Sequence, residues 1–342
     1  MMSFIRFISF LVLPSMLLVG LFANAQTAGV PPQQRTPGRQ KVIIDTDIGD
    51  DIDDVLAVGL ALNSPELEVI GITSVWGDTK LRARMLDRLL RETGHSEIPV
   101  AVGIERHKQK EAAFSQAPWA QREPERPHPD AVSFLLQQIN KYPGEITLIA
   151  IAPETNLAAA IKRDPATFGK LNRIVIMGGA VRLGYDDRAP LITQPPVPEY
   201  NIVMDIPAAQ AVFTSGVPLY VMPLDSTQLK LEERKREMIF TRSTSLTDAM
   251  TLLYHLWSRE TKQVTPTMFD AVAVAYTIDP QQCPVTPLHI EIDAEGFTRE
   301  KSGQPNSYVC LSSDTDSFFR FYLARVLAGE PASPRPAIPP SN

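Results

Sequence analysis

The sequence has few cysteines, no excess of positive charge and, beyond its first 25 residues, no long apolar run. Cys283 and Cys310 are the only cysteines in 342 residues, which argues against a metal site built from thiolate ligands. They could form a disulfide if the chain is exported, or remain two buried thiols, and the sequence leaves both open. The formal net charge of −6 argues against a general nucleic-acid-binding protein, which would carry basic patches.

The first 25 residues have the pattern of a secretory signal. Arg6 supplies the positive charge, residues 7–21 are apolar, and Ala23 to Ala25 form a small-residue cleavage site. The alternative is a membrane anchor, for which the apolar run is short. Residues 26–40 are Pro-containing and are expected to be a disordered lead-in. We therefore expect an exported, periplasmic or secreted protein, with no membrane contact after signal cleavage.

Strand-like and helix-like patterns alternate from residue 41 onward, and 44% apolar with 21% charged residues is typical of a folded domain. Short apolar runs predict strands at 42–44, 67–75, 99–102, 146–151, 173–177 and 218–222. Segments between them predict helices at 55–62, 81–93, 130–142, 157–162 and 206–214, with long loops at 103–128 and 182–200. Further helices are expected near 231–261, 270–278 and 315–328, with strands near 287–292 and 307–311. This order predicts an α/β fold, a single large domain over 41–330 with a mostly parallel central sheet flanked by helices, and a Pro-rich tail at 331–342.

Six of the ten residues from Asp45 to Asp54 are aspartates, directly after the first predicted strand. So many like charges repel one another strongly where water is scarce. Either most of them face solvent and the last one caps the next helix, or several converge on a cation. Carboxylate oxygens are hard ligands that suit Ca²⁺ or Mg²⁺. We favour the cation because ligands bind at the carboxyl ends of strands in α/β folds.

Polar residues recur at the predicted carboxyl ends of the other strands. Asp78, the pair Thr155 and Asn156, and Asp225 each follow one of them. Each residue could be a turn or a cap when taken alone. Because the carboxyl ends of parallel strands share one edge of the sheet, we expect these side chains to form one rim.

Several motifs in order resemble the inosine–uridine-preferring nucleoside hydrolase family, over roughly residues 41–328. The most specific is the aspartate motif, Asp45-Thr-Asp47-x-Gly49 with Asp53-Asp54 before an apolar helix. The supporting motifs lie at 146–157, 177–180, 199–201, 269–276 and 296–299. The resemblance implies a single α/β domain, a homo-oligomer and a tightly held Ca²⁺. It implies the following ligands for that ion: the carboxylates of Asp47, Asp54 and Asp270 and the backbone carbonyl of Thr155.

The resemblance also implies the roles of the substrate residues. Asp47 would accept a proton from the attacking water, and Asp53 would hold the ribose 2′-hydroxyl with Asp78 nearby. Glu199 and Asn201 would bind the 5′ and 3′ side of the sugar, and Met177 would line its pocket. Such carboxylates suit cleavage of an N-glycosidic bond, because positive charge builds on the sugar in the transition state.

The chain departs from the family pattern at four places. Ile48 replaces a proline, and two extra residues precede Asp53-Asp54; the competing alignment would use Asp50-Asp51 and leave Ile52 interrupting the helix start. Phe269 stands where many members have a histidine that protonates the departing purine, and a phenyl ring can stack on a base but cannot donate a proton. Asp78 stands in place of an asparagine. The loop at 182–198 is long, and its candidates for a family asparagine contact are Asp186, Asp187 and Thr193.

We predict a Ca²⁺-dependent hydrolase that splits ribonucleosides into base and ribose. One alternative is an exported, non-catalytic Ca²⁺-dependent protein that binds nucleosides or sugars, given the missing histidine. A lesser alternative is a metal-dependent phosphohydrolase of the haloacid dehalogenase type, which also has an Asp-x-Asp after its first strand. That pattern requires Thr or Val two places after the second Asp, where this chain has Gly49.

Overall fold

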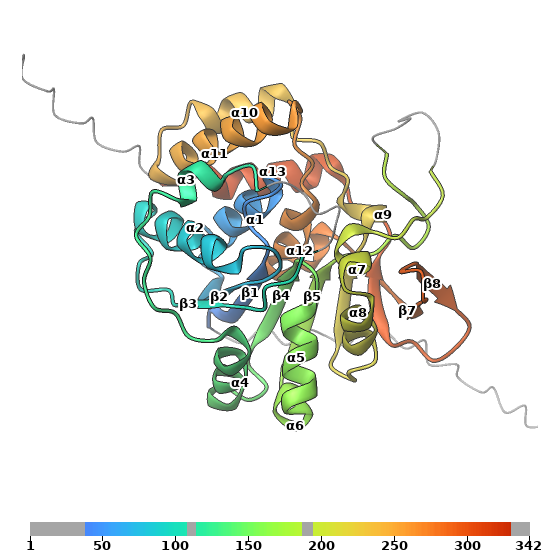
Figure 1. Cartoon of the computed structure of the whole chain (residues 1–342). Helices are drawn as coiled ribbons and strands as arrows, with labels where there is room; N and C mark the ends of the chain where they lie inside the picture. Colours follow the sequence, from blue (N-terminus) through green and yellow to red (C-terminus); the bar gives the residue numbers. More distant parts are fainter. Residues whose placement is uncertain (1–37, 108–113, 187–193, 330–342) are drawn as a thin grey trace, which may run out of the picture. The chain divides into compact units, whose positions relative to one another are not determined.

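A nine-stranded sheet organises the part of the chain that the structure describes (Figure 1). The structure is a computed structural model, and it describes residues 38–107, 114–186 and 194–329, which belong to one compact unit. The predicted signal sequence, nearly all of the predicted lead-in, the tail, and the loop candidates Asp187 and Thr193 lie outside these residues. The strands, in chain order, are β1 (Gln40–Thr46), β2 (Leu67–Ser74), β3 (Val100–Val102), β4 (Thr147–Ile151), β5 (Arg173–Met177), β6 (Leu219–Met222), β7 (Val285–Ile292), β8 (Thr298–Lys301) and β9 (Ser307–Cys310).

The spatial order of the strands is β3-β2-β1-β4-β5-β6-β9-β7-β8. All pairs from β3 to β9 are parallel, whereas β7 runs antiparallel to both β9 and β8. The predicted α/β fold with a mostly parallel sheet is therefore confirmed. From β1 the chain first moves outward to β2 and β3 and then returns to β4 on the other side. The carboxyl ends of β1 and β4 thus form a topological switch point, where such sheets bind ligands.

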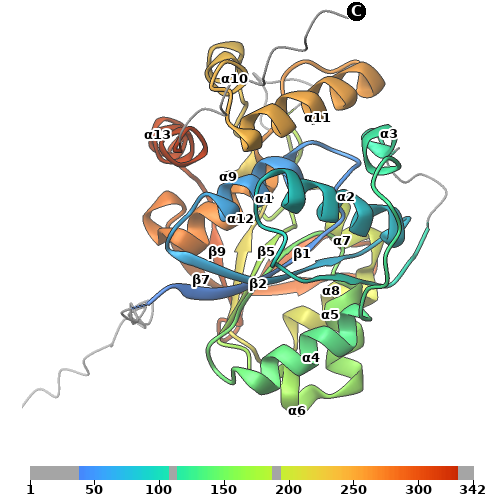
Figure 2. The same ribbon diagram turned by 90° about the vertical axis from the view of Figure 1, so that its left-hand side faces the viewer.

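Helices cover both faces of the sheet (Figure 2). One layer contains α1 (Asp53–Leu62), α2 (Thr79–Glu92), α3 (Ala117–Ala120), α10 (Glu233–Phe240), α11 (Ser245–Thr261), α12 (Phe269–Ile278) and α13 (Thr315–Val326). The other contains α4 (Ala131–Lys141), α5 (Thr155–Arg163), α6 (Pro165–Phe168) and α8 (Ile206–Phe213). The short helices α7 (Tyr200–Met204), α9 (Leu224–Thr227) and η1 (Pro280–Gln282) connect these elements.

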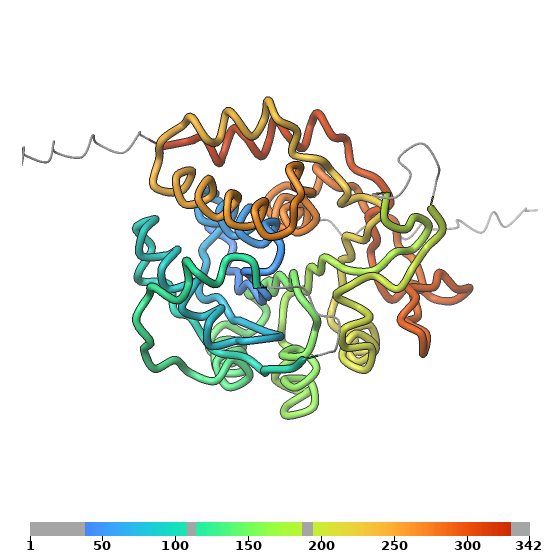
Figure 3. Tube along the Cα trace, turned by 45° about the horizontal axis from the view of Figure 1, so that its top comes forward, coloured from blue at the N-terminus to red at the C-terminus, as the bar shows by residue number. Residues whose placement is uncertain are grey.

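The first strand shows how the sequence produces this layering. Val42 and Ile44 pack into the core on the α1 side, whereas Ile43 packs into the core on the α4 side. Alternate side chains of a strand point to opposite faces, so an unbroken apolar run is what a strand buried on both faces requires. Helix α1 is buried along almost its whole length, and α12 packs directly against it, as Figures 2 and 3 both show.

Several details differ from the expectations or settle them. The predicted loop at 103–128 contains α3, and the predicted helix at 231–261 is two helices, α10 and α11. The sequence does not decide whether Cys283 and Cys310 pair. In the structure they form a buried disulfide with a Cα–Cα distance of 5.6 Å. Among the described residues, no helix combines the length and the apolar character that a bilayer span needs.

Candidate active site

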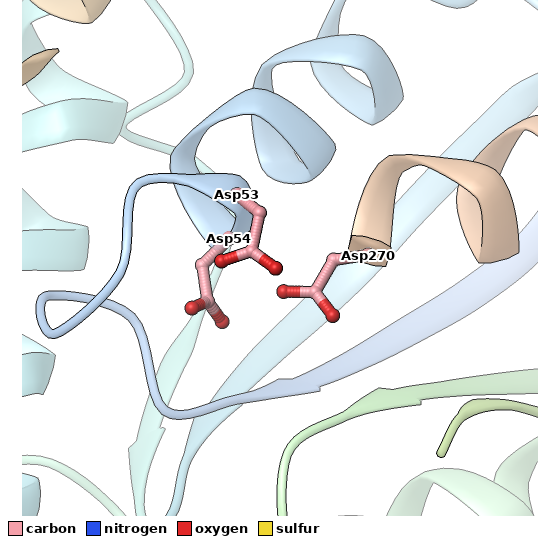
Figure 4. Close-up of side chains that lie close together, drawn as sticks. All are labelled: Asp53, Asp54 and Asp270. Atoms are coloured by element: carbon pink, nitrogen blue, oxygen red, sulfur yellow. The ribbon is translucent and has the colours of Figure 1, made fainter. Parts of the chain in front are cut away.

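Three buried aspartates converge at the switch point (Figure 4). Asp53 and Asp54 lie in the first turn of α1, and Asp270 lies in the first turn of α12. One oxygen from each carboxylate lies within 4.8 Å of the others, and the three residues are 6%, 4% and 3% exposed. The packing of α1 against α12 thus brings together residues that are far apart in the chain.

The electrostatics of this cluster call for a positive charge. Burial raises the pKa values of Asp53, Asp54 and Asp270 well above the ordinary aspartate value, and repulsion by neighbouring carboxylates, Asp47 among them in each case, raises them further. A divalent cation among the carboxylates would remove the repulsion and favour the ionised forms. The donor set of hard, buried oxygens fits an alkaline-earth ion. The N-terminal ends of α1 and α12 add partial positive charge on the same side.

Hydroxyl and amide groups hold two of the neighbouring aspartates in place. The Thr46 hydroxyl donates a hydrogen bond to Asp54. Asp45 accepts from the Thr73 hydroxyl and from Asn156 Nδ2, the latter at 2.8 Å, so β1, β2 and α5 are linked below the cluster. Burial raises the pKa of Asp45 to about 7, and these two hydrogen bonds oppose that effect. Asp45 and Asn156 therefore act as supports for the rim.

Asp47, the predicted base and metal ligand, lies on the loop between β1 and α1 and is 7% exposed. Burial raises its pKa to about 7, while the Arg82 guanidinium opposes the shift. Among the described residues, the closest carboxylate triad contains Asp53, which we had assigned to the ribose, rather than Asp47. Asp47 nevertheless repels all three members of the triad electrostatically. The structure thus brings Asp47, Asp53, Asp54 and Asp270 into one region, and their separate roles stay predictions.

The predicted sugar-side residues lie along the same edge of the sheet. Glu199 caps α7 and accepts hydrogen bonds from the backbone N–H groups of Gly179 at 2.9 Å and Asn201 at 3.0 Å. Asn201 Nδ2 donates to the carbonyl of Met177, the last residue of β5, at 2.9 Å. Burial raises the pKa of Glu199 to about 7, and the backbone donors oppose that shift. Glu199, Asn201 and Met177 therefore form one hydrogen-bonded unit.

Thr155 and Asp78 have local structural partners. Thr155 is buried at the start of α5, and its hydroxyl donates to Asp205 at 2.7 Å. This contact involves the side chain, so the role of the Thr155 backbone carbonyl as a metal ligand stays a prediction. Asp78 is exposed and accepts from the Leu81 N–H as the N-cap of α2. Asp225 likewise accepts from the N–H groups of Val181 and Arg182. For Asp78 the cap role is established, and contact with ribose stays a prediction.

Phe269 is half-buried beside Asp270, and the Tyr185 ring packs against it in a perpendicular arrangement, with ring centroids 6.2 Å apart. No sequence pattern singles out Tyr185, because it lies in the long loop whose alignment with the family is uncertain. Asp186, a candidate in the same loop, forms an ion pair with Lys230 at 3.0 Å.

Three of the five histidines in the sequence contact other groups of the protein. His128 contacts Asp87 at 2.9 Å, and His289 contacts the carbonyl of Gln304 at 2.8 Å. His255 packs on the rings of Phe240 and Tyr254.

Two charged residues near the site were missed by the sequence reasoning. Arg82 is only 2% exposed and contacts the aspartate loop. It lies one turn before Met85 and Leu86 on the buried face of α2. A charged residue at an apolar position of the helical pattern is the sequence feature that could have identified it. Glu154, between β4 and α5, is fully buried, and neither carboxylate oxygen has a hydrogen-bond partner among the described residues. No pattern in the sequence distinguishes it.

Comparison with known proteins gives matches over most of the chain. The family model described as inosine-uridine preferring nucleoside hydrolase matches residues 42–320. Uridine nucleosidase 1 of Arabidopsis thaliana is 36% identical over 212 residues, which is 57% of this chain. The chain spans about three fifths (59%) of the length of that curated relative. Probable uridine nucleosidase 2 of the same plant is 30% identical, with 84% of this chain and 98% of the relative covered.

A solved structure has the same architecture. The plant nucleoside hydrolase PpNRh1 superposes with a TM-score of 0.74 and is 28% identical. The superposition covers 85% of this chain and 99% of that one.

Proposed function

The chain belongs to the inosine–uridine preferring nucleoside hydrolase family, and from this membership we propose that it hydrolyses the N-glycosidic bond of ribonucleosides to free base and ribose. The observation that carries the proposal is the convergence of Asp53, Asp54 and Asp270 at the switch point of the sheet. The phosphohydrolase alternative is not taken further, because the family match covers residues 42–320. Uridine, which appears in the names of two relatives, is the first substrate to test.

We propose Ca²⁺ as the bound metal. The family is metal-dependent. The three buried carboxylates each offer one oxygen within 4.8 Å of the other two, and oxygen is a hard donor. Ca²⁺ accepts several protein oxygens in flexible geometry, whereas Mg²⁺ usually keeps more of its water. When bound, the ion would supply a Lewis acid that orients water and lowers its pKa.

The residues themselves suggest how the reaction proceeds. Asp47 is proposed as the general base, because a carboxylate whose pKa lies near neutrality can both accept and release a proton at working pH. The surrounding carboxylates stabilise the positive charge that develops on the sugar as the bond to the base breaks. The unit of Glu199, Asn201 and Met177 is proposed to hold the sugar, so that the bond and the attacking water stay aligned.

We also propose that the protein is exported. The signal-like pattern of residues 1–25 supports this, and so does the Cys283–Cys310 disulfide, because disulfides persist in oxidising compartments. Homo-oligomer formation is a further proposal from the family resemblance, and light scattering on the purified protein would test it.

The decisive experiment is base and ribose release from a panel of ribonucleosides, before and after removal of metal by a chelator. Asp54→Asn is expected to lower kcat at least about 10²-fold, since it removes a charge where the positive charge develops. Asp248→Asn is a matched control, because Asp248 also lies in the first turn of a helix but is exposed. If the panel gives binding without release, the non-catalytic binding protein is the correct alternative. Release that survives both chelation and Asp54→Asn would refute the proposal.

A further inference from the structure

The loop that carries Asp47 is held from behind by one buried guanidinium. Arg82 Nη1 donates to the carbonyls of Asp47 and Ile48, the latter at 3.0 Å. Its Nη2 forms an ion pair with Asp50 Oδ2 at 2.9 Å. Its Nε donates to the carbonyl of Trp76 at 2.8 Å. One side chain thus ties the loop after β1 to the loop after β2.

The contacts involve the residues by which this chain departs from the family motif. Asp50 lies in the stretch lengthened by two residues, yet it is only 8% exposed. Ser115 Oγ donates to the Asp50 carbonyl at 2.7 Å, and Gln116 Nε2 donates to the Asp51 carbonyl at 2.7 Å. The Phe114 ring covers the guanidinium, with its centroid 5.0 Å from Arg82 Cζ. The longer loop is therefore a packed structure with its own set of partners.

The chemistry of the contacts requires arginine in particular. A guanidinium offers donors in a rigid planar fork, and here they reach two loops and one carboxylate at once. Lysine has a single ammonium group and could not make these contacts together. A buried charge of this kind is stable only while its ion pair and its hydrogen bonds are complete. Asp50 and the carbonyls complete them.

We propose that Arg82 is a positioning residue that fixes the backbone of Asp47, and that its ion pair with Asp50 keeps the guanidinium in place. The loop then holds the Asp47 carboxylate at a constant distance from the triad of Asp53, Asp54 and Asp270. This inference rests on the proposed function, because it assigns Arg82 a role only through Asp47.

The test compares Arg82→Lys and Asp50→Asn with the control Arg84→Lys. Arg84 lies on the same helix, but its guanidinium contacts the carbonyls of Gln121 and Glu123, away from the aspartate loop. Ca²⁺ alone is titrated by calorimetry, and kcat and KM for uridine are measured separately. Arg82→Lys is expected to weaken Ca²⁺ binding about 10- to 100-fold and to lower kcat about 10²-fold, with KM changed less than about 3-fold. Asp50→Asn is expected to have a smaller effect in the same direction, and Arg84→Lys none.

Each outcome decides the question. A folded Arg82→Lys protein with unchanged Ca²⁺ affinity and kcat would overturn the proposal, as would a rise in KM at constant kcat. If Arg82→Lys does not fold, as judged by circular dichroism, Asp50→Asn decides, since it keeps the arginine and removes only its ion pair. Unchanged Ca²⁺ affinity and kcat in a folded Asp50→Asn protein would then overturn the proposal. If the unmodified protein binds Ca²⁺ but hydrolyses no ribonucleoside, the proposed function fails, and the Ca²⁺ affinities of the variants still test the role of Arg82.

Discussion

Asp53 and Asp270 face one another from the first turns of α1 and α12, with one carboxylate oxygen of each within 4.8 Å of the other (Figure 4). Two carboxylates at this separation cannot both be ionised without a compensating charge, so they share either a proton or a cation. The state of the pair therefore links metal binding, pH and stability.

Without the Asp270 carboxylate, the free energy of unfolding should no longer increase when Ca²⁺ is added. At a concentration about 100 times its dissociation constant, a bound ion stabilises the folded protein by about 2.7 kcal/mol. Asp270→Asn keeps the size of the side chain but removes a charge, so we expect this gain to be largely lost and the metal-free variant to be at least as stable as the metal-free parent. Thermal unfolding with and without Ca²⁺ measures both, with Asp248→Asn as the control. An undiminished Ca²⁺ effect in Asp270→Asn would contradict the assignment.

The metal-free protein should become less stable as the pH rises. In the folded state the pKa values of Asp45, Asp47 and Glu199 are about 7, above the ordinary values of 3.8 and 4.5. Between these values the folded state holds more protons than the unfolded state, so the free energy of unfolding falls with increasing pH. One pKa unit corresponds to about 1.4 kcal/mol, so the loss between pH 4 and pH 8 should amount to several kcal/mol.

Urea unfolding of the chelator-treated protein across this pH range measures the effect. Saturating Ca²⁺ should flatten the profile above pH 6, because the ion takes the place of the protons at the cluster. A metal-free protein that grows more stable from pH 5 to pH 8 would show that the carboxylates are not buried as described.

Glu154 and Glu199 should respond in opposite ways to the same substitution. Glu154 is buried without a hydrogen-bond partner among the described residues, and burial raises its pKa well above the ordinary value. Glu154→Gln removes the penalty for ionisation, so at pH 8 we expect about 1–3 kcal/mol of added stability, and less at pH 5. Glu199→Gln should instead destabilise the protein, since Glu199 accepts from three backbone N–H groups. Equal effects at both positions would refute the distinction.

The Cys283–Cys310 disulfide should contribute to stability. It closes a loop with a sequence separation of 27, for which the entropy of the unfolded chain predicts about 3.5 kcal/mol. The double variant Cys283→Ser with Cys310→Ser should therefore have a lower urea midpoint than the parent. Reduction of the parent by dithiothreitol under unfolding conditions should give the same shift. A midpoint that does not change in either case would mean that the bond does not form in solution.

Local sequence patterns predicted most of the strands of the sheet, but not the elements that depend on contacts with distant parts of the chain. The apolar runs at 42–44 and 173–177 match β1 and β5 because each strand is buried on both faces. β8 was missed because it is a short, polar edge strand, Thr298–Lys301, that depends on β7 for its pairing. The helix predicted at 231–261 breaks where Ser243 adopts a left-handed φ of 59° and Thr244 starts α11 with a capping box. In the sequence, neither Ser243 nor Thr244 stands out against the helical periodicity of the residues on both sides of the break.

The candidate site was predictable only in part for the same reason. The aspartate motif and Asp270 could be found because each has a recognisable local context, an apolar strand or an apolar helix. Arg82 and Glu154 could not be found in this way, because their surroundings exist only in the folded chain. Arg82 pairs with Asp50, and Glu154 is buried without a hydrogen-bond partner among the described residues. The choice between Asp53 and Asp47 as the third carboxylate depends on side-chain directions at the start of α1, which sequence spacing does not determine.

Phe269 provides the clearest test of how the base departs. It lies next to Asp270 and packs against Tyr185, but a phenyl ring has no proton to give to a leaving purine. Phe269→His places an imidazole at this position. We expect kcat/KM for inosine to rise about 10-fold or more near pH 6, and the gain to disappear above the pKa of the imidazole, because only its protonated form is an acid. A riboside with a nitrophenolate leaving group needs no such proton, so its rate should stay within a factor of about 3.

Phe269→Leu is the control, since it removes the aromatic ring without adding an acid. If Phe269→His and Phe269→Leu change inosine hydrolysis alike, protonation at this position does not limit the reaction. A parent enzyme that already hydrolyses inosine as fast as the nitrophenyl riboside would show that another residue supplies the proton. In that case Tyr185, whose ring packs against Phe269, is the first residue to substitute, by Tyr185→Phe.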